Sequence, residues 1–267
     1  MASTTELVHC LRIAVQASRQ AGVLLRRRVG RPRHIGTKRS AIDLVTEVDR
    51  AAERIIYRTL HRAFPSHAFL GEERTHAYHQ APYQWIVDPL DGTTNFIHGV
   101  PAFAVSIALA YQGRPIVGVI YDPMREELFT ASRGAGARLN GRRIHVSATR
   151  RLADSLLSTG FSTSFRAHSA RYLAWFKAFQ MRCHAVRRMG STALSLAYVA
   201  CGREEGFYER EIWPWDAAAG MVLVEEAGGR VTNFRGAPLR LKERQIVASN
   251  GSIHDAMIRF LTRASRP

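Results

Sequence analysis

The sequence predicts an α/β fold of the α+β kind, with antiparallel strands gathered in its first half. Three observations support this prediction. Apolar side chains recur at helical spacing over residues 7–25, which indicates a long first helix. Strand-like runs at residues 105–111 and 115–121 flank Gln112-Gly113, a pattern typical of a β-hairpin. After residue 150, short strands alternate with helices, as in α/β proteins.

The change of pattern near residue 150 also divides the chain. The first part, residues 1–150, is expected to form an α+β half built on long helices and hairpins. The second part, residues 151–267, is expected to form an α/β half. No repeat or low-complexity linker separates them, so we expect the two halves to pack closely against each other.

Capping signals place the first two helices. Ser3 and Glu6 have the spacing of a capping box and open a helix that ends near Arg28. Thr46 and Asp49 have the same spacing and open a second helix. Further helices are predicted at residues 166–181, 192–201, 216–227 and 252–263.

The strands are placed by short apolar runs between turn residues. We expect further strands at residues 68–70, 85–87, 127–132, 156–159, 206–209, around 231 and 245–249. Asn140-Gly141 indicates another tight turn, and Gly228-Gly229 ends a helix. Together these elements describe a chain with enough apolar sequence for a large core.

Composition narrows the class of protein. No apolar run approaches the roughly 20 residues that span a bilayer, so no membrane partner is expected. The N-terminus lacks the basic start and apolar stretch of a secretory signal. Cys10, Cys183 and Cys201 are scattered and have no metal-ligand spacing, which favours small buried residues in a reducing compartment. We therefore expect a cytoplasmic protein.

The net charge of +16 is the unusual bulk property. Residues 24–40 and 133–151 are rich in Arg and contain no acid. Such segments can attract anionic substrates, RNA or DNA. They can equally form a solvated face in a chain with Arg-biased composition. We favour the solvated face, because no nucleic-acid-binding motif and no interleaved aromatic residues accompany the charge.

The segment WIVDPLDGTTNF, residues 85–96, indicates a catalytic site. Asp88 follows an apolar strand, Pro89 is expected to end the strand ladder, and Asp91 follows in a tight turn. Two carboxylates about 4 Å apart repel by roughly 4 kcal/mol at an effective dielectric near 20. No Lys or Arg occurs between residues 84 and 114, so a divalent cation is the expected counter-charge. Simple turn formation is the alternative for either acid alone.

An anion site is predicted directly after the acidic pair. Gly92 has no side chain, Thr93 and Thr94 add hydroxyls, and together they open a helical turn. Free backbone N–H groups at such a turn can seat a phosphate. A strand end, two acids and an anion cradle in succession predict metal-assisted phosphoryl chemistry.

Two more acidic positions lie at predicted element boundaries. Glu72 belongs to a GEE sequence after a short strand. Asp216 follows Pro214 at a helix start, where the helix terminus would hold its carboxylate facing outward. A simple N-cap is the alternative reading of Asp216. The alanines at 217–219 would let this helix approach another element closely.

The motifs GEE, DPLDGTTNF and WDAAAG, in this order, resemble the inositol monophosphatase family of magnesium-dependent, lithium-sensitive phosphatases. The similarity runs over nearly the whole chain, from DLVTEVD to EEAGG, and YDPMREELFTASRGAGARLNG resembles the bacterial inositol-1-monophosphatase branch. The resemblance implies a layered αβαβα sandwich of the inositol monophosphatase and sugar phosphatase type. It also implies a homodimer.

The resemblance assigns the acidic residues to metal binding. Glu72, Asp88 and the Leu90 carbonyl match the ligands of a first Mg²⁺. Asp88, Asp91 and Asp216 match those of a second, and Glu72 would also touch a third, weakly held ion. The family therefore implies two to three Mg²⁺ ions per site.

The resemblance also assigns catalytic and substrate contacts. Asp49 and Thr93 match the pair that orients and activates the attacking water, and Glu72 is counted with them as catalytic. The implied substrate contacts are Asp91, Gly92, Thr93, Gly190, Ser191, Thr192, Glu209 and Asp216. Thr192 departs from the Ala that many relatives carry, which leaves sugar specificity open.

The expected reaction is hydrolysis of myo-inositol monophosphate to inositol and phosphate by metal-activated water. Displacement is expected to be direct and in line, without a phosphoenzyme. A related sugar phosphatase, for example a fructose-1,6-bisphosphatase, is the alternative within the enzyme class. Association with RNA or a transcription complex through the basic segments is the alternative from another class.

Overall fold

The computed structural model describes residues 3–38, 41–73, 81–162 and 164–263. Its helices are α1 (Thr4–Arg28), α2 (Glu47–Ala63), α3 (Thr93–Ile97), α4 (Phe165–Gln180), α5 (Thr192–Ala200), α6 (Pro214–Glu226) and α7 (His254–Arg263), with one 3-10 turn, η1 (Leu152–Asp154). Both predicted capping boxes are present, at Ser3 before α1 and at Thr46 before α2.

The strands form three sheets. A small sheet pairs β1 (Ile35–Thr37) with β2 (Leu44–Thr46). A seven-stranded sheet is formed, in this spatial order, by β3 (Ala68–Gly71), β4 (Tyr83–Asp91), β5 (Ala104–Tyr111), β6 (Arg114–Asp122), β7 (Glu127–Ser132), β8 (Gly136–Leu139) and β9 (Arg142–Ile144). A five-stranded sheet has the spatial order β11 (Ala185–Arg187), β10 (Leu156–Thr159), β12 (Gly206–Arg210), β14 (Gln245–Ser249) and β13 (Arg230–Thr232).

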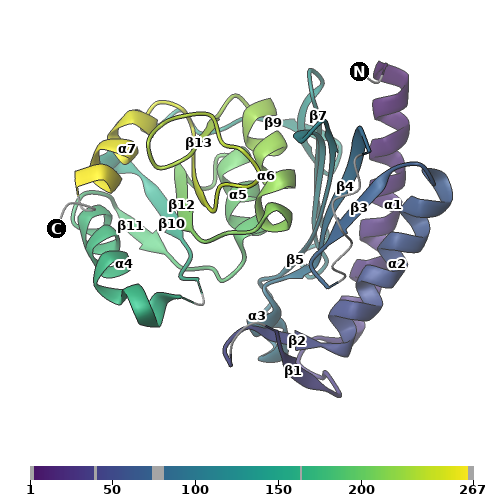
Figure 1. Ribbon diagram of the computed structural model, residues 1–267. Helices are drawn as coiled ribbons and strands as arrows, with labels where there is room; N and C mark the ends of the chain where they lie inside the picture. The colour runs from purple at the N-terminus through teal and green to yellow at the C-terminus, as the bar shows by residue number, and fades with distance from the viewer. Residues whose placement is uncertain (1–2, 39–40, 74–80, 163, 264–267) are drawn as a thin grey trace.

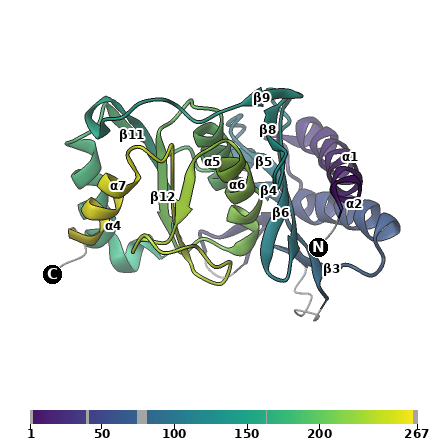
Figure 2. The same ribbon diagram turned by 90° about the horizontal axis from the view of Figure 1, so that it is seen from above.

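Helices and sheets alternate in five layers, as Figures 1 and 2 show. Helices α1 and α2 cover the outer face of the seven-stranded sheet, and α5 and α6 lie between the two sheets. Helices α4 and α7 cover the far face of the five-stranded sheet. This arrangement confirms the predicted αβαβα sandwich. The domain boundary near residue 150 stays a prediction, although the seven-stranded sheet ends at Ile144 and the five-stranded sheet begins at Leu156.

Strand alternation explains why the seven-stranded sheet is covered on both faces. In β4, Trp85 and Val87 pack into the core beneath α1 and α2, whereas Ile86 packs into the core against α5 and α6. On α6, the alanines at 217–219 are all buried, and the helix lies close to the sheet as the sequence predicts. This packing places the first turn of α6 near the end of β4.

One strand prediction was wrong. Pro89 does not end the β4 ladder, because β4 continues to Asp91. The pairs Asp88–Ser106 and Asp91–Ala104 leave two residues of β4 opposite one residue of β5, which is a β-bulge. Because Pro89 lies in the bulge, its missing N–H breaks no regular ladder bond. The acidic pair therefore lies on a bulged strand end instead of a tight turn. Strands β1, β2, β8, β9 and β11 were not predicted, although the tight turn at Asn140-Gly141 that joins β8 to β9 was.

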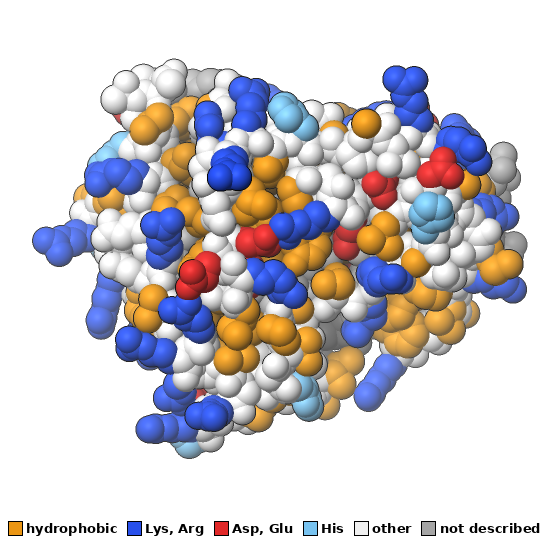
Figure 3. All heavy atoms as spheres, turned by 180° about the vertical axis from the view of Figure 1, so that it is seen from behind, with side chains coloured by type: hydrophobic (Ala, Val, Ile, Leu, Met, Phe, Trp, Pro, Cys, Tyr) orange, Lys and Arg blue, Asp and Glu red, His pale blue; other side chains and the backbone are white. Residues whose placement is uncertain are grey.

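The surface agrees with the basic composition. On the face drawn in Figure 3, Lys and Arg side chains are spread over much of the molecule, with fewer Asp and Glu side chains among them. Arg39 and Ser40, which belong to the first basic segment, lie outside the described residues. All three cysteines are free thiols, and Cys10 is buried while the other two are half-buried. No helix in the described parts of the chain is long and apolar enough to cross a membrane.

Candidate active site

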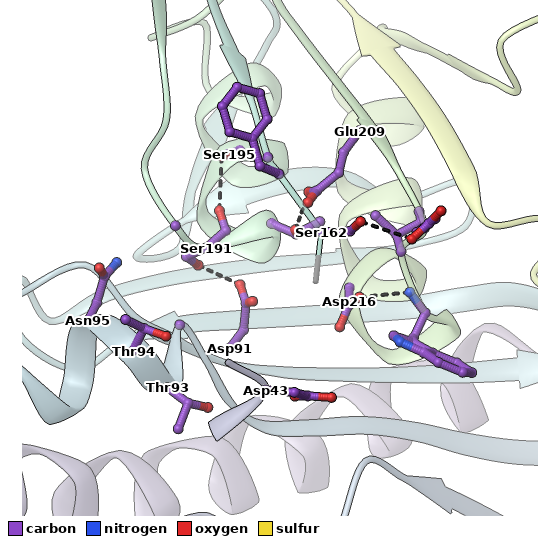
Figure 4. A pocket seen from close by; sticks show the side chains of 18 of the residues that line it. Asp43, Asp91, Thr93, Thr94, Asn95, Ser162, Ser191, Ser195, Glu209 and Asp216 are labelled. Atoms are coloured by element: carbon purple, nitrogen blue, oxygen red, sulfur yellow. Dashed lines mark hydrogen bonds between the residues drawn. The ribbon is translucent and has the colours of Figure 1, made fainter. Parts of the chain in front are cut away.

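Most of the predicted site residues line a cavity of about 520 Å³ where the two halves meet, whereas Asp49, Asp88 and Leu90 are buried outside its lining. Figure 4 shows Thr93, Asp91, Ser191, Glu209 and Asp216 around it. The first two come from the end of β4 and the start of α3, and the other three from the second half of the chain. Glu72, Gly92, Gly190 and Thr192 also line this cavity.

The bulged end of β4 is held by its own backbone. Asp88 Oδ1 accepts a hydrogen bond of 2.9 Å from the Leu90 amide. Gly92 follows with φ +97°, and a Cβ at this position would lie 2.9 Å from the Ala102 carbonyl oxygen. Only glycine fits this left-handed, crowded position. The chain can therefore turn sharply from the acidic strand into α3.

Asp49 and Thr93 contact each other; Thr93 lines the cavity, and Asp49 is fully buried. The Thr93 hydroxyl lies 3.1 Å from Asp49 Oδ1 and 3.1 Å from the Leu90 carbonyl oxygen. Asp49 Oδ2 accepts bonds from the Thr46 amide at 2.8 Å and the Thr46 hydroxyl at 2.5 Å. Burial raises the pKa of Asp49 above its ordinary value, against the lowering effect of the Thr46 bonds. The capping box of α2 thus also orients a predicted catalytic acid, and the role in water activation stays a prediction.

Asp91 joins the two halves of the chain. Its Oδ2 accepts bonds from the Ser191 hydroxyl at 2.5 Å and the Ala193 amide at 2.7 Å. Ser191 is the N-cap of α5, so Asp91 lies at the positive end of that helix. Burial raises the pKa of Asp91 to about 6, and the Ser191 and Ala193 bonds limit the rise.

Asp216 lies in the first turn of α6, but it is not the N-cap. Its Oδ2 accepts a 2.7 Å hydrogen bond from the amide of Trp213, which is the N-cap residue. The carboxylate lies in the cavity, where the packing of α6 against the sheet places it. Burial, followed by the charges of Glu72 and Asp91, raises the pKa of Asp216 well above its ordinary value.

A lysine that directly follows β1, Lys38, contacts the GEE segment. Lys38 Nζ lies 2.8 Å from Glu72 Oε1 and also forms an ion pair with Glu73. Burial lowers the pKa of Lys38, but the charges of Glu72 and Glu73 outweigh it and raise the pKa above the ordinary value. Lys38 belongs to the first basic segment, where no local pattern indicates a contact with Glu72. Because no Lys or Arg lies between residues 84 and 114, Lys38 supplies part of the positive charge near the acidic residues.

Glu53 is a site residue that sequence reasoning missed. It is fully buried on α2, and its Oε2 accepts a 2.9 Å hydrogen bond from the Glu73 amide. A Cβ on Gly71 would lie 2.2 Å from the same carboxylate oxygen, so the glycine makes room for it. Glu53 thereby holds the backbone just after Glu72 and packs closely against Gly71 just before it. The sequence feature that could have indicated Glu53 is its position four residues after Asp49, which puts both side chains on the same face of the helix.

The far wall of the cavity carries the predicted polyol contacts. The Thr192 hydroxyl donates a 2.6 Å hydrogen bond to Glu209 Oε2. Burial raises the pKa of Glu209 to about 7, and the Thr192 bond limits the rise. The preceding Met189 carbonyl accepts a 2.8 Å bond from Asn95, which ties this wall to α3. The Thr that departs from the family pattern therefore contacts the predicted specificity residue directly.

The donor chemistry of the site fits a divalent cation. Burial, then the charges of Glu72, Asp91 and Asp216, raise the pKa of Asp88 well above its ordinary value. Several carboxylates thus gather in one buried region where their charges repel, and oxygen ligands of this kind suit Mg²⁺. Among the described residues, no three Asp, Glu, His or Cys side chains already stand at the geometry of a metal's ligands. The individual ligand assignments therefore stay predictions.

The layered αβαβα fold and the acidic cavity agree with the predicted class of phosphatase, and comparison with known proteins supports that class. The profile of the Inositol monophosphatase family matches residues 6–265. This chain belongs to the inositol monophosphatase family.

Individual relatives carry two kinds of name. The chain is 47% identical over 256 residues to the Nus factor SuhB of Pseudomonas aeruginosa, covering 93% of this chain and 94% of that protein. It is 42% identical over 255 residues to the inositol-1-monophosphatase of Mesorhizobium japonicum, covering 95% of this chain and 96% of the relative. The solved inositol monophosphatase from Anabaena (Nostoc) superimposes with a TM-score of 0.89 at 44% identity, covering 97% of each chain.

Proposed function

We propose that this protein is a Mg²⁺-dependent phosphomonoesterase that hydrolyses myo-inositol monophosphate to inositol and phosphate. The observation that carries the proposal is the Asp49–Thr93 contact beside the buried carboxylates Asp88 and Asp91. The relatives named inositol-1-monophosphatase and inositol monophosphatase support the choice of substrate.

The chain's own groups would position the reacting water. The Thr93 hydroxyl has one proton to donate, and both Asp49 and the Leu90 carbonyl lie within reach of it. The lone pairs of Thr93 are then available to accept a hydrogen bond from a water. As the water gives a proton to Thr93, the hydroxyl passes its own proton to the carboxylate of Asp49, which is buried, has a raised pKa and acts as the base.

The phosphate would lie at the start of α3. The backbone amides of Gly92 and Thr93 are expected to seat its oxygens. Glu72, Asp88, Asp91, Asp216 and the Leu90 carbonyl are the residues proposed to hold two to three Mg²⁺ ions. When bound, these ions neutralise phosphate charge and lower the pKa of a bound water. The polyol would lie against Glu209, whose orientation depends on Thr192.

Phosphate release tests this proposal. Purified protein is given myo-inositol 1-phosphate with Mg²⁺, with chelator, and with added Li⁺, beside a panel of sugar and nucleotide phosphates. We expect Mg²⁺-dependent, Li⁺-inhibited turnover with preference for the inositol ester. Preference for fructose 1,6-bisphosphate would keep the chemistry and replace the substrate by the sugar phosphate alternative. A folded protein inactive on the whole panel would overturn the enzyme proposal.

The relatives named Nus factor SuhB favour a second proposal, association with RNA or a transcription complex through the basic segments. Arg142 and Arg150 of the second segment are exposed and available for such contacts. Fluorescence anisotropy with labelled RNA should show binding that weakens steeply with salt. The Arg142→Glu, Arg150→Glu double variant should weaken it while phosphatase activity is retained. No binding at low salt would exclude direct RNA contact.

We also propose a homodimer, which the family resemblance supports. Light scattering coupled to size-exclusion chromatography measures the mass directly. A mass near twice the 29.9 kDa of the chain is expected. A monomer at micromolar concentration would contradict this proposal.

A further inference from the structure

A second cavity, of about 810 Å³, lies away from the candidate active site. It is enclosed by β4, the turn between β5 and β6, the last turns of α6, and residues 238–243. None of its lining residues lines the first cavity. Helix α6 connects the two sites: Asp216 faces the first, and Glu225 lines the second, about 13 Å further along the helix axis.

The floor of the second cavity is apolar except at one position. Ile86, Met221 and Val231 form part of it and are almost completely buried. Gln84 lies on the same face of β4 as Ile86, because strand side chains alternate. Its neighbour across the sheet is Ala110, a small residue. The sequence therefore places an amide next to the apolar Ile86 at this end of the strand.

Two hydrogen-bond donors at the second cavity are buried without a partner. Gln84 Nε2 and Arg133 Nε make no hydrogen bond to any residue that the structure describes. Arg133 is nevertheless fixed in place, because its Nη2 donates to Glu225 at 2.9 Å and to the Pro115 carbonyl at 3.2 Å. A buried donor without an acceptor costs stability. Because neither nitrogen has accessible surface in the cavity, each side chain must turn toward a ligand to reach its acceptor oxygens.

The charge around the cavity also favours an anion. Arg114 and Arg240 lie exposed at its rim. Of the two acids in the lining, Glu225 pairs with Arg133, which leaves the single charge of Glu243 against the two rim arginines. Positive charge is therefore in excess at the mouth of the cavity, which raises the local concentration of anions.

We propose that the second cavity binds a small organic anion that joins an apolar body to a carboxylate, sulfonate or phosphate group. The apolar body lies on the floor formed by Ile86, Met221 and Val231. The acceptor oxygens take bonds from Gln84 and Arg133, and the rim cations hold the charge. Most binding pockets for small molecules combine an apolar lining with a few polar groups in this way.

Anilinonaphthalene sulfonate is a suitable probe, because it has an aromatic body, one anionic group and fluorescence that rises in apolar sites. The full chain with Mg²⁺ is titrated with the dye, with and without saturating inorganic phosphate to occupy the active site. We expect saturable binding at one site that phosphate does not displace. Non-saturable fluorescence, or displacement by phosphate, would overturn the proposal.

Variants locate the dye. Arg240→Glu changes an exposed side chain and should leave the fold intact while weakening binding about tenfold. Gln84→Leu removes one unpartnered donor and should also weaken binding severalfold, with an unchanged melting temperature as the check of folding. Arg58→Glu, exposed on α2 and far from the cavity, is the matched control and should bind as the parent does. Equal affinity in all three variants would place the dye elsewhere and refute the site.

Discussion

Thr93 Oγ1 lies 3.1 Å from Asp49 Oδ1, although the two residues are 44 positions apart in the chain. The contact joins the first turn of α2 to the first residue of α3. Asp49 already completes the capping box of α2, so its second oxygen is presented at a defined position. One carboxylate therefore serves helix initiation and the proposed chemistry together.

Replacing Thr93 tests this contact. Thr93→Ala should lower kcat by about a hundredfold or more, because the hydroxyl between water and Asp49 is lost. Thr93→Ser keeps the hydroxyl and should retain most of the activity. Steady-state phosphate release measures both variants. Equal activity of the Ala and Ser variants would show that the hydroxyl takes no part in the reaction.

Asp91→Asn should abolish turnover while the fold is preserved. The amide keeps one acceptor for Ser191 and Ala193 but removes the negative charge expected to bind the cation. Circular dichroism and phosphate release check the two parts of this prediction. A well-folded variant with near-normal phosphate release would contradict the assignment of Asp91.

Glu53 should act on the reaction through Glu72. Glu53→Ala removes the acceptor for the Glu73 amide, so more Mg²⁺ should be needed for half-maximal activity and kcat should fall. Glu53→Gln keeps an acceptor oxygen and should recover most of the loss. Isothermal titration with Mg²⁺ provides a second readout. If both variants lost stability but kept the parent's Mg²⁺ dependence, Glu53 would have a structural role only.

Lys38 should stabilise the cation-free protein more than the loaded one. Lys38→Met leaves Glu72 and Glu73 without their ammonium partner, and breaking a largely buried ion pair costs about 3 kcal/mol or more. The melting temperature in chelator should therefore fall by several degrees. Saturating Mg²⁺ should restore much of the difference. A loss of the same size in both conditions would argue against this compensation.

His254 should make the stability depend on pH. It is fully buried, with Nδ1 2.8 Å from the Ser249 hydroxyl and Nε2 2.8 Å from the Thr232 hydroxyl. Burial lowers its pKa from 6.5 to about 4, so between these values the unfolded chain binds the proton and the folded chain does not. The free energy of unfolding should therefore fall as the pH drops from 6.5 to 4, by at most about 3 kcal/mol.

Urea unfolding at a series of pH values measures this dependence. His254→Gln cannot take up a proton and is the matched variant. Its stability at neutral pH should be lower, but the part of the slope due to His254 should be absent. An unchanged slope in the variant would assign the pH dependence to other groups.

Much of the fold was predictable because its signals are local. The capping boxes at Ser3 and Thr46 marked helix starts, and the boundaries of β7, β10 and β14 agree with the residues predicted. The bulge at Pro89 was missed, because the pairing of β4 with β5 depends on a partner strand that local patterns do not show. Strand β11 was missed for a similar reason: it is three residues long and pairs with β10.

Local sequence was enough to predict metal and phosphate chemistry, since an acidic pair followed by Gly92 and two threonines indicates both. The order of three motifs was enough to identify the family. Three contacts could be seen only in the folded chain: Lys38 with Glu72, Glu53 with the Glu73 amide, and Asp216 in the lining of the cavity. These contacts join segments far apart in the chain, and their geometry follows from the packing of helices on sheets, which no local pattern encodes.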